Sequence, residues 1–287
     1  MRTGVASARE AVRSATERLA RADVPEPEAS ATVLLSELLG IGRAELALHP
    51  RPLTEEQAAL YEAWISRRLE REPVQRILGY AYFRHLILEL NEETLIPSPD
   101  TESVVDLVLE RIDERDGPCR VLDIGTGSGA IAISIAAERP SCEVHAADIS
   151  ERALEIARRN AERNDARVSL HRADIAQGLE LLDESVHLLV ANPPYVEGGE
   201  VAKLSPEVRD WEPRTAVEGG TDGLHYFRRI FAETPPLLRN GSEVVLEVGD
   251  GQAEAVLALG GDAGFTPLGS RPDLAGTPRA VLLRWER

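Results

Sequence analysis

The segment Asn192-Pro193-Pro194-Tyr195 combines residue types that can hold a flat amino group. The Asn192 side chain and the Pro193 carbonyl offer oxygen acceptors for its two hydrogens, and the Tyr195 ring offers an apolar face. The two prolines restrict their own φ angles and the residue before them, so the turn keeps one shape. We predict catalytic roles for Asn192, Pro193 and Tyr195 and substrate contacts for all four residues. A proline-rich loop after a strand, with no ligand, is the alternative.

A glycine-rich turn earlier in the chain predicts a second binding element. An apolar strand precedes it and an apolar helix, 131–137, follows it, so its backbone can approach a ligand that faces the helix N-terminus. The spacing Gly-x-Gly-x-Gly differs from that of dinucleotide-binding folds. Asp148 ends the next predicted strand, where a carboxylate can accept hydrogen bonds from a ribose diol. The residues of the turn are Gly125, Thr126, Gly127, Ser128 and Gly129.

In this order on successive strands, these motifs resemble the class I methyltransferases that bind S-adenosylmethionine, and among those the amino-group methylases. The resemblance implies that the glycine turn, residues 125–129, wraps the methionine portion and the ribose of the cofactor. Asp148 is then expected to hold the ribose hydroxyls, with Ile149 against the adenine and Asn192 beside the cofactor. Asp174 and Ile175 correspond to the adenine-edge position, although a simple loop cap is the alternative for Asp174.

Composition limits the class of protein. The chain has 287 residues, enough for one large and one small domain. No apolar run approaches the roughly 20 residues that span a bilayer, and the N-terminus lacks a signal-peptide core, so we expect a soluble, cytoplasmic protein without a membrane partner. Cys119 and Cys142 start neighbouring predicted strands, and without a CxxC motif or histidine cluster they indicate buried thiols in a reducing compartment, not a metal site.

The net charge of −17 disfavours a nucleic-acid partner, because affinity for phosphate backbones comes from lysine and arginine contacts. The densest basic cluster is interrupted by glutamates, so a solvated helix face is the better interpretation of it than a nucleic-acid patch. This cluster consists of Arg67, Arg68, Arg71 and Arg76.

The hydrophobic pattern divides the chain into three parts: a helical bundle at 1–78, a β-hairpin linker at 79–98 and a catalytic domain at 99–287. In the linker, Leu86, Leu88 and Leu90 alternate before a turn at 91–93 and a second apolar run at 94–96. In the catalytic domain, strands and helices alternate, which predicts an α/β fold with a largely parallel sheet and ligands at the carboxyl ends of its strands. The predicted strands are 120–123, 143–147, 168–171, 186–191, 243–248, 265–268 and 279–285.

At the level of the whole chain, residues 5–285 resemble the protein-(glutamine-N5) methyltransferases that modify peptide-chain release factors. The segments that carry this likeness include Pro73 to Gly79, the turn at 96–102, Asn192 to Tyr195, Trp211-Glu212-Pro213 and the glycine-rich run at 219–224. The resemblance implies a Rossmann-like, seven-stranded mixed sheet behind a helical substrate-recognition domain. It also implies the glutamine of the Gly-Gly-Gln loop of class-1 release factors as the methyl acceptor. The long segment 196–222 is expected to act as a lid.

Two departures from the family pattern bear on the choice of partner. Ser98 stands where the family usually has arginine, and residues 82–86 replace the usual Phe-Tyr-Gly-Leu. Three alternatives therefore stay open at this point. A diverged relative can methylate another amide or amine, an adenine-N6 methylase of DNA or RNA also needs to grip a planar –NH2 group, and a scaffold can bind the cofactor without catalysis.

Overall fold

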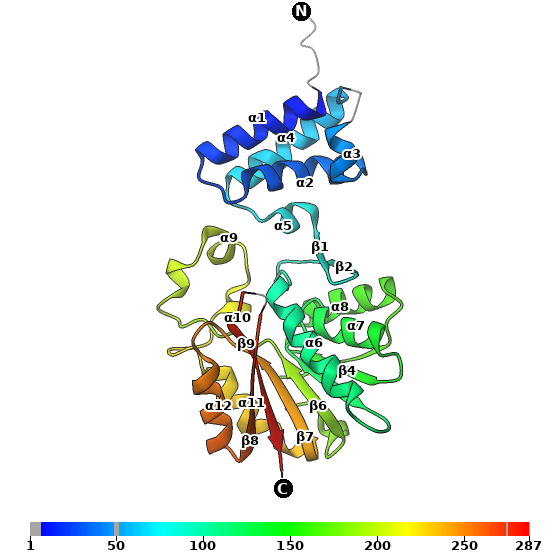
Figure 1. Cartoon of the computed structure of the whole chain (residues 1–287), viewed down its shortest axis with the longest axis vertical. Coiled ribbons are helices and arrows are strands. Elements are labelled where there is room, and N and C mark those ends of the chain that lie inside the picture. Colours follow the sequence, from blue (N-terminus) through cyan, green and yellow to red (C-terminus); the bar gives the residue numbers. More distant parts are fainter. Residues whose placement is uncertain (1–6, 49–51, 274, 287) are drawn as a thin grey trace, which may run out of the picture. The chain divides into compact units, whose positions relative to one another are not determined.

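The computed structural model describes residues 7–48, 52–273 and 275–286, and the chain forms two compact units, residues 1–79 and 80–287 (Figure 1). The first unit is helical. Ser7 and Glu10 close one capping box, and Thr54 and Gln57 close another. Its helices are α1 (Ala8–Arg21), α2 (Pro27–Leu39), α3 (Arg43–Ala47), α4 (Glu55–Leu69) and α5 (Val74–Leu78).

The prediction that the arginine cluster of this unit forms a solvated helix face is wrong for Arg68. Arg68 does not lie on a solvated helix face, because it is only 4% exposed. Its guanidinium donates to the Ser30 hydroxyl and to the Glu72 carbonyl, at 3.3 Å in each case. Arg67 forms an ion pair with the Glu72 carboxylate at 2.6 Å. These arginines therefore brace the packing of α4 against α2 and the following turn instead of forming a free basic patch.

The second unit begins with a β-hairpin whose turn lies earlier than predicted. Strand β1 (Tyr80–Phe83) pairs with β2 (Leu86–Glu89), so the chain reverses at Arg84 and not at 91–93. Arg84 takes a φ of 52° and its N–H donates to Glu102, while its guanidinium forms ion pairs with Glu138 and Asp106 at 2.6 Å. These long-range contacts stabilise a left-handed backbone that hydrophobic alternation alone does not predict.

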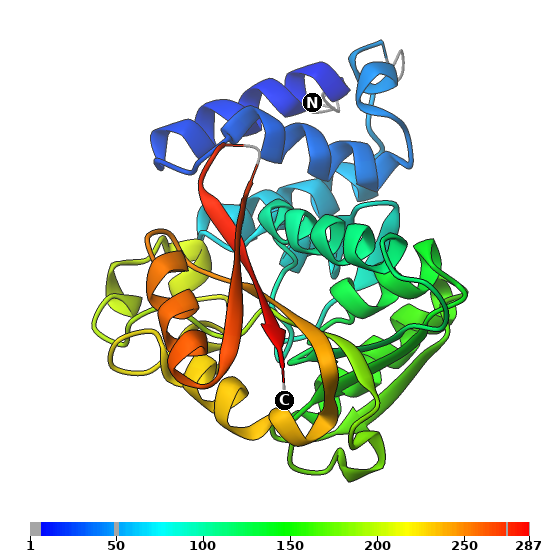
Figure 2. The same cartoon turned by 60° about the horizontal axis from the view of Figure 1, so that its bottom comes forward.

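The predicted seven-stranded mixed sheet is confirmed. Its strand order is β5-β4-β3-β6-β7-β9-β8; the first five strands run parallel, and β9 is antiparallel to both of its neighbours. The closing ribbon of β8 and β9 is long and twisted (Figure 2). The strands are β3 (Arg120–Ile124), β4 (Glu143–Asp148), β5 (Val168–Arg172), β6 (Val186–Ala191), β7 (Leu238–Glu247), β8 (Phe265–Pro272) and β9 (Pro278–Trp285).

Helices cover both faces of this sheet, which makes three layers (Figure 1). Alternate residues of each central strand enter different cores: Val121 packs with the first group of helices and Leu122 with the second. The first group is α6 (Pro99–Asp113), α7 (Ala130–Glu138) and α8 (Glu151–Arg163), and the second is α11 (His225–Glu233) and α12 (Ala253–Asp262).

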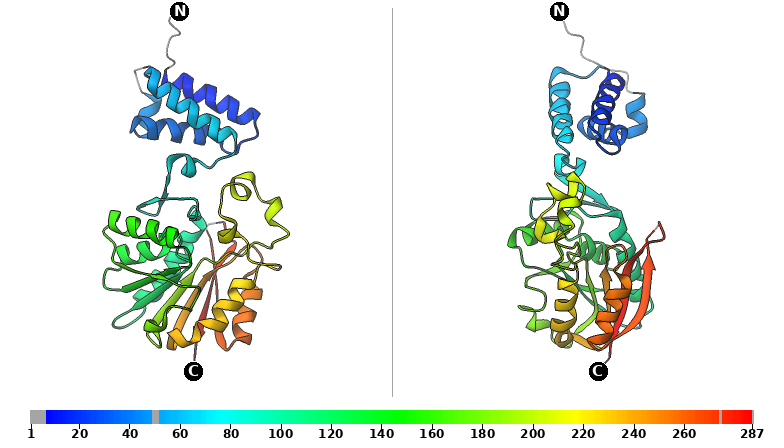
Figure 3. Two further views of the ribbon diagram at one scale, coloured as in Figure 1. Left: turned by 180° about the vertical axis from the view of Figure 1, so that it is seen from behind. Right: turned by 90° about the vertical axis from the view of Figure 1, so that its left-hand side faces the viewer.

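The segment 196–222 leaves the sheet after β6 and returns before α11. It contains only short helices, α9 (Pro206–Arg209), α10 (Arg214–Val217) and the 3₁₀ turn η2 (Val201–Lys203). Figure 3 shows it, in yellow-green, as an excursion from the layered body. The Glu212 carboxylate accepts from the Ile96 N–H at 3.2 Å, which anchors the excursion to the proline turn ahead of α6.

Candidate cofactor and substrate site

A pocket of about 590 Å³ lies at the carboxyl ends of β3, β4 and β6. The predicted glycine turn, Asp148 and Asn192 all line it, although the sequence separates them widely. Thr215 and Ala216 of the excursion and Thr101 of α6 complete the wall. The predicted residues that line this pocket are Gly125, Thr126, Gly127, Ser128, Asp148, Ile149, Asp174, Ile175, Asn192, Pro193 and Pro194.

The glycine turn holds its shape through left-handed backbone angles. Gly125 and Gly127 have φ values of 72° and 55°, and added Cβ atoms there would meet nothing within 4 Å. Glycine is therefore required at these positions for the left-handed backbone conformation and not for lack of space. Gly129 has a φ of 86° and does not line the pocket. A Cβ on Gly129 would lie 2.6 Å from the Ile133 side chain, so this glycine serves the close packing of α7.

Asp148 has hydrogen-bonding capacity left for a ligand. One of its carboxylate oxygens accepts from the Gly127 N–H and the other from the Ser150 N–H, both at 2.9 Å. The Ile149 N–H donates to the same carboxylate, whose two oxygens offer about four lone-pair sites in all, so acceptor capacity remains, and Asp148 lines the pocket. Burial raises the pKa of Asp148, and the backbone donors act against that rise. Two acceptor oxygens at a strand end suit the two hydroxyls of a ribose.

Beneath the turn, Asp123 is fully buried and one of its oxygens accepts from the Thr126 hydroxyl at 2.6 Å. Burial raises the pKa of Asp123 to about 7, against the hydrogen bond from Thr126. This contact holds the Thr126 side chain, so it supports the turn, and Thr126 lines the pocket.

The predicted adenine-side residues Ile149, Asp174 and Ile175 all line the pocket. Ile149 is 63% exposed although it is a large apolar residue, which suits a flat ring placed against it. Ile175 is buried and takes a φ of 56°. The Asp174 carboxylate forms an ion pair with Arg229 of α11 at 2.9 Å, so a side-chain bond holds this loop to the second helix layer.

The Asn192–Tyr195 turn is held from several sides. The Tyr195 carbonyl accepts from the Gln252 side chain at 2.9 Å. A Cβ on Gly219 would lie 2.7 Å from the Pro194 carbonyl oxygen and 2.8 Å from the Tyr195 Cα, so only glycine permits this close approach. Tyr195 itself does not line the pocket. Burial and the nearby Glu247 carboxylate raise the pKa of its hydroxyl to about 12.

Sequence reasoning missed the pocket residues Thr215 and Ala216 and, beside the pocket, Glu247. Glu247 is the last residue of β7 and only 1% exposed, and its carboxylate accepts from the Thr101 hydroxyl at 2.7 Å. The same hydroxyl accepts from the Asn192 amide at 3.3 Å. A charged residue at the end of an apolar strand, the position that Asp148 also occupies, was the available signal.

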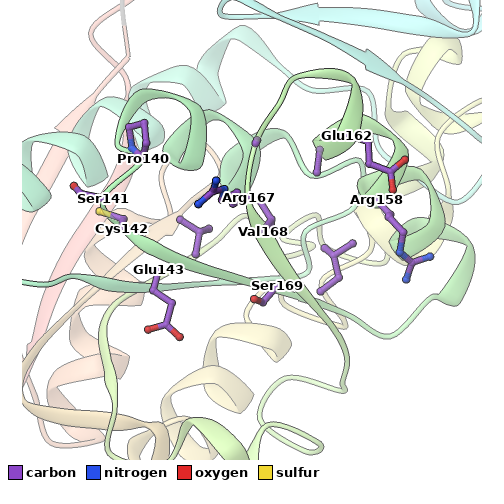
Figure 4. A pocket seen from close by; sticks show the side chains of 13 residues that line it. Pro140, Ser141, Cys142, Glu143, Arg158, Glu162, Arg167, Val168 and Ser169 are labelled. Carbon is purple, nitrogen blue, oxygen red and sulfur yellow. The ribbon is translucent and has the colours of Figure 1, made fainter.

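A second hollow, of about 630 Å³, lies at the opposite ends of β4 and β5 (Figure 4). Arg158 and Arg167 line it together with Glu143 and Glu162, so its charge is mixed, and none of the motif residues reaches it. Over the described ranges there is no group of His, Cys, Asp or Glu suited to a metal ion. Nor does the described part of the chain contain a helix that is long and apolar enough to cross a membrane.

Comparisons with known proteins agree with this geometry. The family model described as the PrmC N-terminal domain matches residues 10–79, and the one described as the methyltransferase small domain matches residues 100–207. A methyltransferase from Pyrococcus furiosus has a solved structure with a TM-score of 0.53 and 19% identity; the match covers 79% of this chain and 98% of that one. This last likeness shows the fold.

Curated relatives extend the comparison to nearly the whole chain. The release factor glutamine methyltransferase of Cereibacter sphaeroides is 38% identical over 280 residues, 96% of this chain and 98% of the relative. The protein of the same name from Streptomyces coelicolor is 40% identical over 276 residues, 95% and 96% of the two chains.

The sheet order, the glycine turn after β3 and the carboxylate at the end of β4 define a class I methyltransferase, an enzyme whose methyl donor is S-adenosylmethionine. Within that class, the identity along both units is decisive. The chain belongs to the release factor glutamine methyltransferase family.

Proposed function

We propose that this enzyme transfers a methyl group from S-adenosylmethionine to the side-chain nitrogen N5 of a glutamine, within the Gly-Gly-Gln motif of class-1 peptide-chain release factors. One observation carries the proposal: the pocket places the free acceptor capacity of Asp148 and the Asn192 amide in a single cavity. Relatives that share 38–40% of their residues with this chain bear the name of that activity.

The residues present fit the cofactor. Asp148 offers acceptor capacity for the ribose hydroxyls, Gly125 and Gly127 let the backbone of the turn approach a ligand, and Ile149 offers an exposed apolar surface for the adenine. When bound, S-adenosylmethionine supplies a methyl group on a positively charged sulfur. We assign the binding role to residues 125–128, Asp148, Ile149, Asp174 and Ile175, with Gly129 supporting the turn through its packing against α7 and Asn192 at the boundary with the acceptor.

The acceptor nitrogen is the chemical obstacle, because its lone pair is delocalised into the carbonyl with a rotation barrier of about 18–20 kcal/mol. Oxygen acceptors from Asn192 and Pro193 that take both N–H groups orient this lone pair and favour pyramidal nitrogen. Their effect grows as the nitrogen becomes positive, so they stabilise the transition state more than the ground state. Pro194 and Tyr195 keep the turn rigid, and the nitrogen loses its extra proton after the bond has formed.

We propose that the helical unit recognises the protein substrate and that the excursion 196–222 acts as a lid. The division into a recognition domain at 1–78, a linker at 79–98 and a catalytic domain at 99–287 is part of this proposal. The net charge of −17 argues against DNA or RNA as the direct substrate. A partner in translation termination places the enzyme in the cytoplasm.

A transfer assay with tritiated S-adenosylmethionine tests the proposal. The purified enzyme is offered host release factor, total RNA and DNA in parallel, and we expect label only in release factor. A release-factor variant with Gln→Asn in the Gly-Gly-Gln motif is the matched substrate control. Label in RNA or DNA would support the adenine-N6 alternative. Label in none of the three would favour a relative that methylates another acceptor, as the departure from the family pattern at Ser98 allows.

The same assay tests the role of Asn192. Asn192→Ala is expected to lower kcat by roughly a hundredfold or more, the usual loss when an oriented polar group at a reacting centre is removed. Cofactor affinity, measured by calorimetry, should change little, because the amide is proposed to grip the acceptor nitrogen. A variant that keeps a near-normal rate contradicts the mechanism.

A further inference from the structure

A chain of hydrogen bonds runs from a buried carboxylate to the amide of Asn192. Glu247, 1% exposed, accepts from the Thr101 hydroxyl at 2.7 Å, and Thr101, 3% exposed, accepts from the Asn192 side-chain nitrogen at 3.3 Å. The three residues come from the end of β7, the first turn of α6 and the turn after β6. None of these contacts is local in sequence, so the fold itself assembles the chain.

The donors in this chain fix which end of the Asn192 amide faces the pocket. An ionised carboxylate can only accept, so the single hydrogen of the Thr101 hydroxyl is committed to Glu247. Thr101 then has only lone pairs to offer, and the neighbouring group must be the –NH2 end of Asn192. The carbonyl oxygen of that amide is left for the other side, where Asn192 lines the pocket.

Resting on the proposed function, we propose that Glu247 is a positioning residue that acts through Thr101, and through its own weaker hydrogen bond from the Asn192 –NH2 group, to hold the Asn192 carbonyl oxygen toward the acceptor nitrogen. A flipped amide would present N–H groups to the N–H groups of the substrate, and donor would face donor. The relay therefore selects the one rotamer of Asn192 that can accept, without any contact between Glu247 and the substrate.

The surroundings of Glu247 give this relay a pH dependence. Burial raises the pKa of the Glu247 carboxyl to about 7; the bond from Thr101, the charge of Arg279 and the Asn192 amide act to lower it, and Asp100 acts to raise it. The Tyr195 hydroxyl faces the same carboxyl and stays protonated in this range, because burial raises its pKa to about 12. A protonated Glu247 can donate to Thr101, which frees the Thr101 hydrogen and removes the preference between the two amide orientations.

The test compares kcat and KM for release-factor methylation across about pH 5.5 to 8.5. The wild-type kcat should fall on the acid side with a midpoint near the Glu247 pKa of about 7. Glu247→Gln should lower kcat by about tenfold and remove this acid limb, since a neutral amide accepts or donates at any pH. Thr101→Val should lower kcat and flatten the acid limb less than Glu247→Gln does, because the weaker direct bond between Asn192 and Glu247 remains, and Thr101→Ser, which keeps the hydroxyl, should restore the wild-type profile.

Glu243→Gln is the matched control. Glu243 lies on the same strand and is 3% exposed, but it forms ion pairs with Arg111 and Arg284, outside the pocket. Its variant should lose stability and keep the acid limb of kcat.

If the wild-type enzyme has no activity on release factor, the proposed function is refuted. If the wild type is active and Glu247→Gln has the same pH profile, the role of Glu247 in the hydrogen-bond relay is refuted. If Glu247→Gln does not fold, a Thr101→Val profile that matches Thr101→Ser refutes it instead.

Discussion

At the scale of single residues, the site depends on acceptors that the fold has only partly used. Asp148 accepts from the backbone N–H groups of Gly127, Ser150 and Ile149 and keeps its remaining acceptor capacity for a ligand. Asn192 gives its N–H end to Thr101 and keeps its oxygen. In both cases a hydrogen bond within the protein orients the side chain and leaves an oxygen acceptor free. A rigid site can therefore still bind the polar groups of a ligand.

Substitutions at Asp148 separate these two uses. Asp148→Ala should weaken cofactor binding by one or two charge-assisted hydrogen bonds, each worth about 1.5–3 kcal/mol. Asp148→Asn keeps one acceptor oxygen and should give an intermediate affinity. Calorimetric titration with S-adenosylhomocysteine measures both, and circular dichroism checks the fold. Unchanged affinity in a folded Asp148→Ala variant would remove the ribose assignment.

The residues of the site differ in how far sequence reasoning could predict them. Asp148 and the residues 192–194 stand in local motifs at strand ends, and all of them line the pocket. Tyr195 and Gly129 stand in the same motifs but turn away from the pocket, which periodicity cannot show. Glu247 acquires its meaning from Thr101, 146 positions earlier, so no local pattern could reveal the pair.

At the scale of elements, the excursion 196–222 and the glycines that end it shape the motif turn. Gly219 lies against the Pro194 carbonyl and the Tyr195 Cα, so the returning chain buttresses the turn by backbone contact. Apolar runs predicted the strands of the sheet and the family resemblance its mixed order, although β7 begins five residues before the predicted 243 and β8 ends four residues after the predicted 268. The hairpin turn at Arg84 did not, because its ion pairs with Glu138 and Asp106 are long-range contacts.

Gly219→Ala tests this buttress. The added Cβ would overlap backbone atoms at 2.7–2.9 Å, and backbone cannot move aside as a flexible side chain can, so the motif turn must shift. A displacement of about 1 Å in a reacting group costs on the order of a hundredfold in rate, so kcat should fall by that amount. Gly199→Ala, in the same excursion with nothing within 4 Å, is the control and should keep the wild-type kcat.

At the scale of the whole molecule, the buried carboxyl of Glu247 links folding to pH. Burial raises its pKa from 4.5 to about 7, so the folded state binds this proton more tightly than the unfolded state does. The resulting stability is present below pH 4.5 and is lost as the pH rises through about 7. The wild type should therefore lose up to about 3 kcal/mol of unfolding free energy from this group as the pH rises from about 5 to about 8, and Glu247→Gln, which has no such proton to lose, should not.

Urea unfolding at about pH 5 and about pH 8 measures this difference. Glu243→Gln is again the control, because the pKa of Glu243 is shifted in the opposite direction. Burial acts to raise the pKa of Glu243, but the hydrogen bonds to Arg111 and Arg284 outweigh burial and lower it. Its stabilising effect is complete above the unfolded value of 4.5, so its variant should show a constant deficit from pH 5 to pH 8. A constant difference for Glu247→Gln as well would contradict a raised pKa.

The helical unit gives the last prediction. Its core forms within residues 1–79, and the residues that line the pocket belong to the second unit, so we expect cofactor binding not to require the helical unit. A chain that starts at Tyr80 should keep the circular dichroism of an α/β fold and bind S-adenosylhomocysteine with the affinity of the intact enzyme. It should methylate full-length release factor with a KM raised by about tenfold or more, as expected when recognition by a remote surface is lost.

A short peptide that contains the Gly-Gly-Gln motif is the control substrate, and the intact and the truncated enzyme should methylate it at equal rates. If the folded second unit methylates the full-length factor as efficiently as the whole enzyme, the helical unit has a role other than substrate recognition.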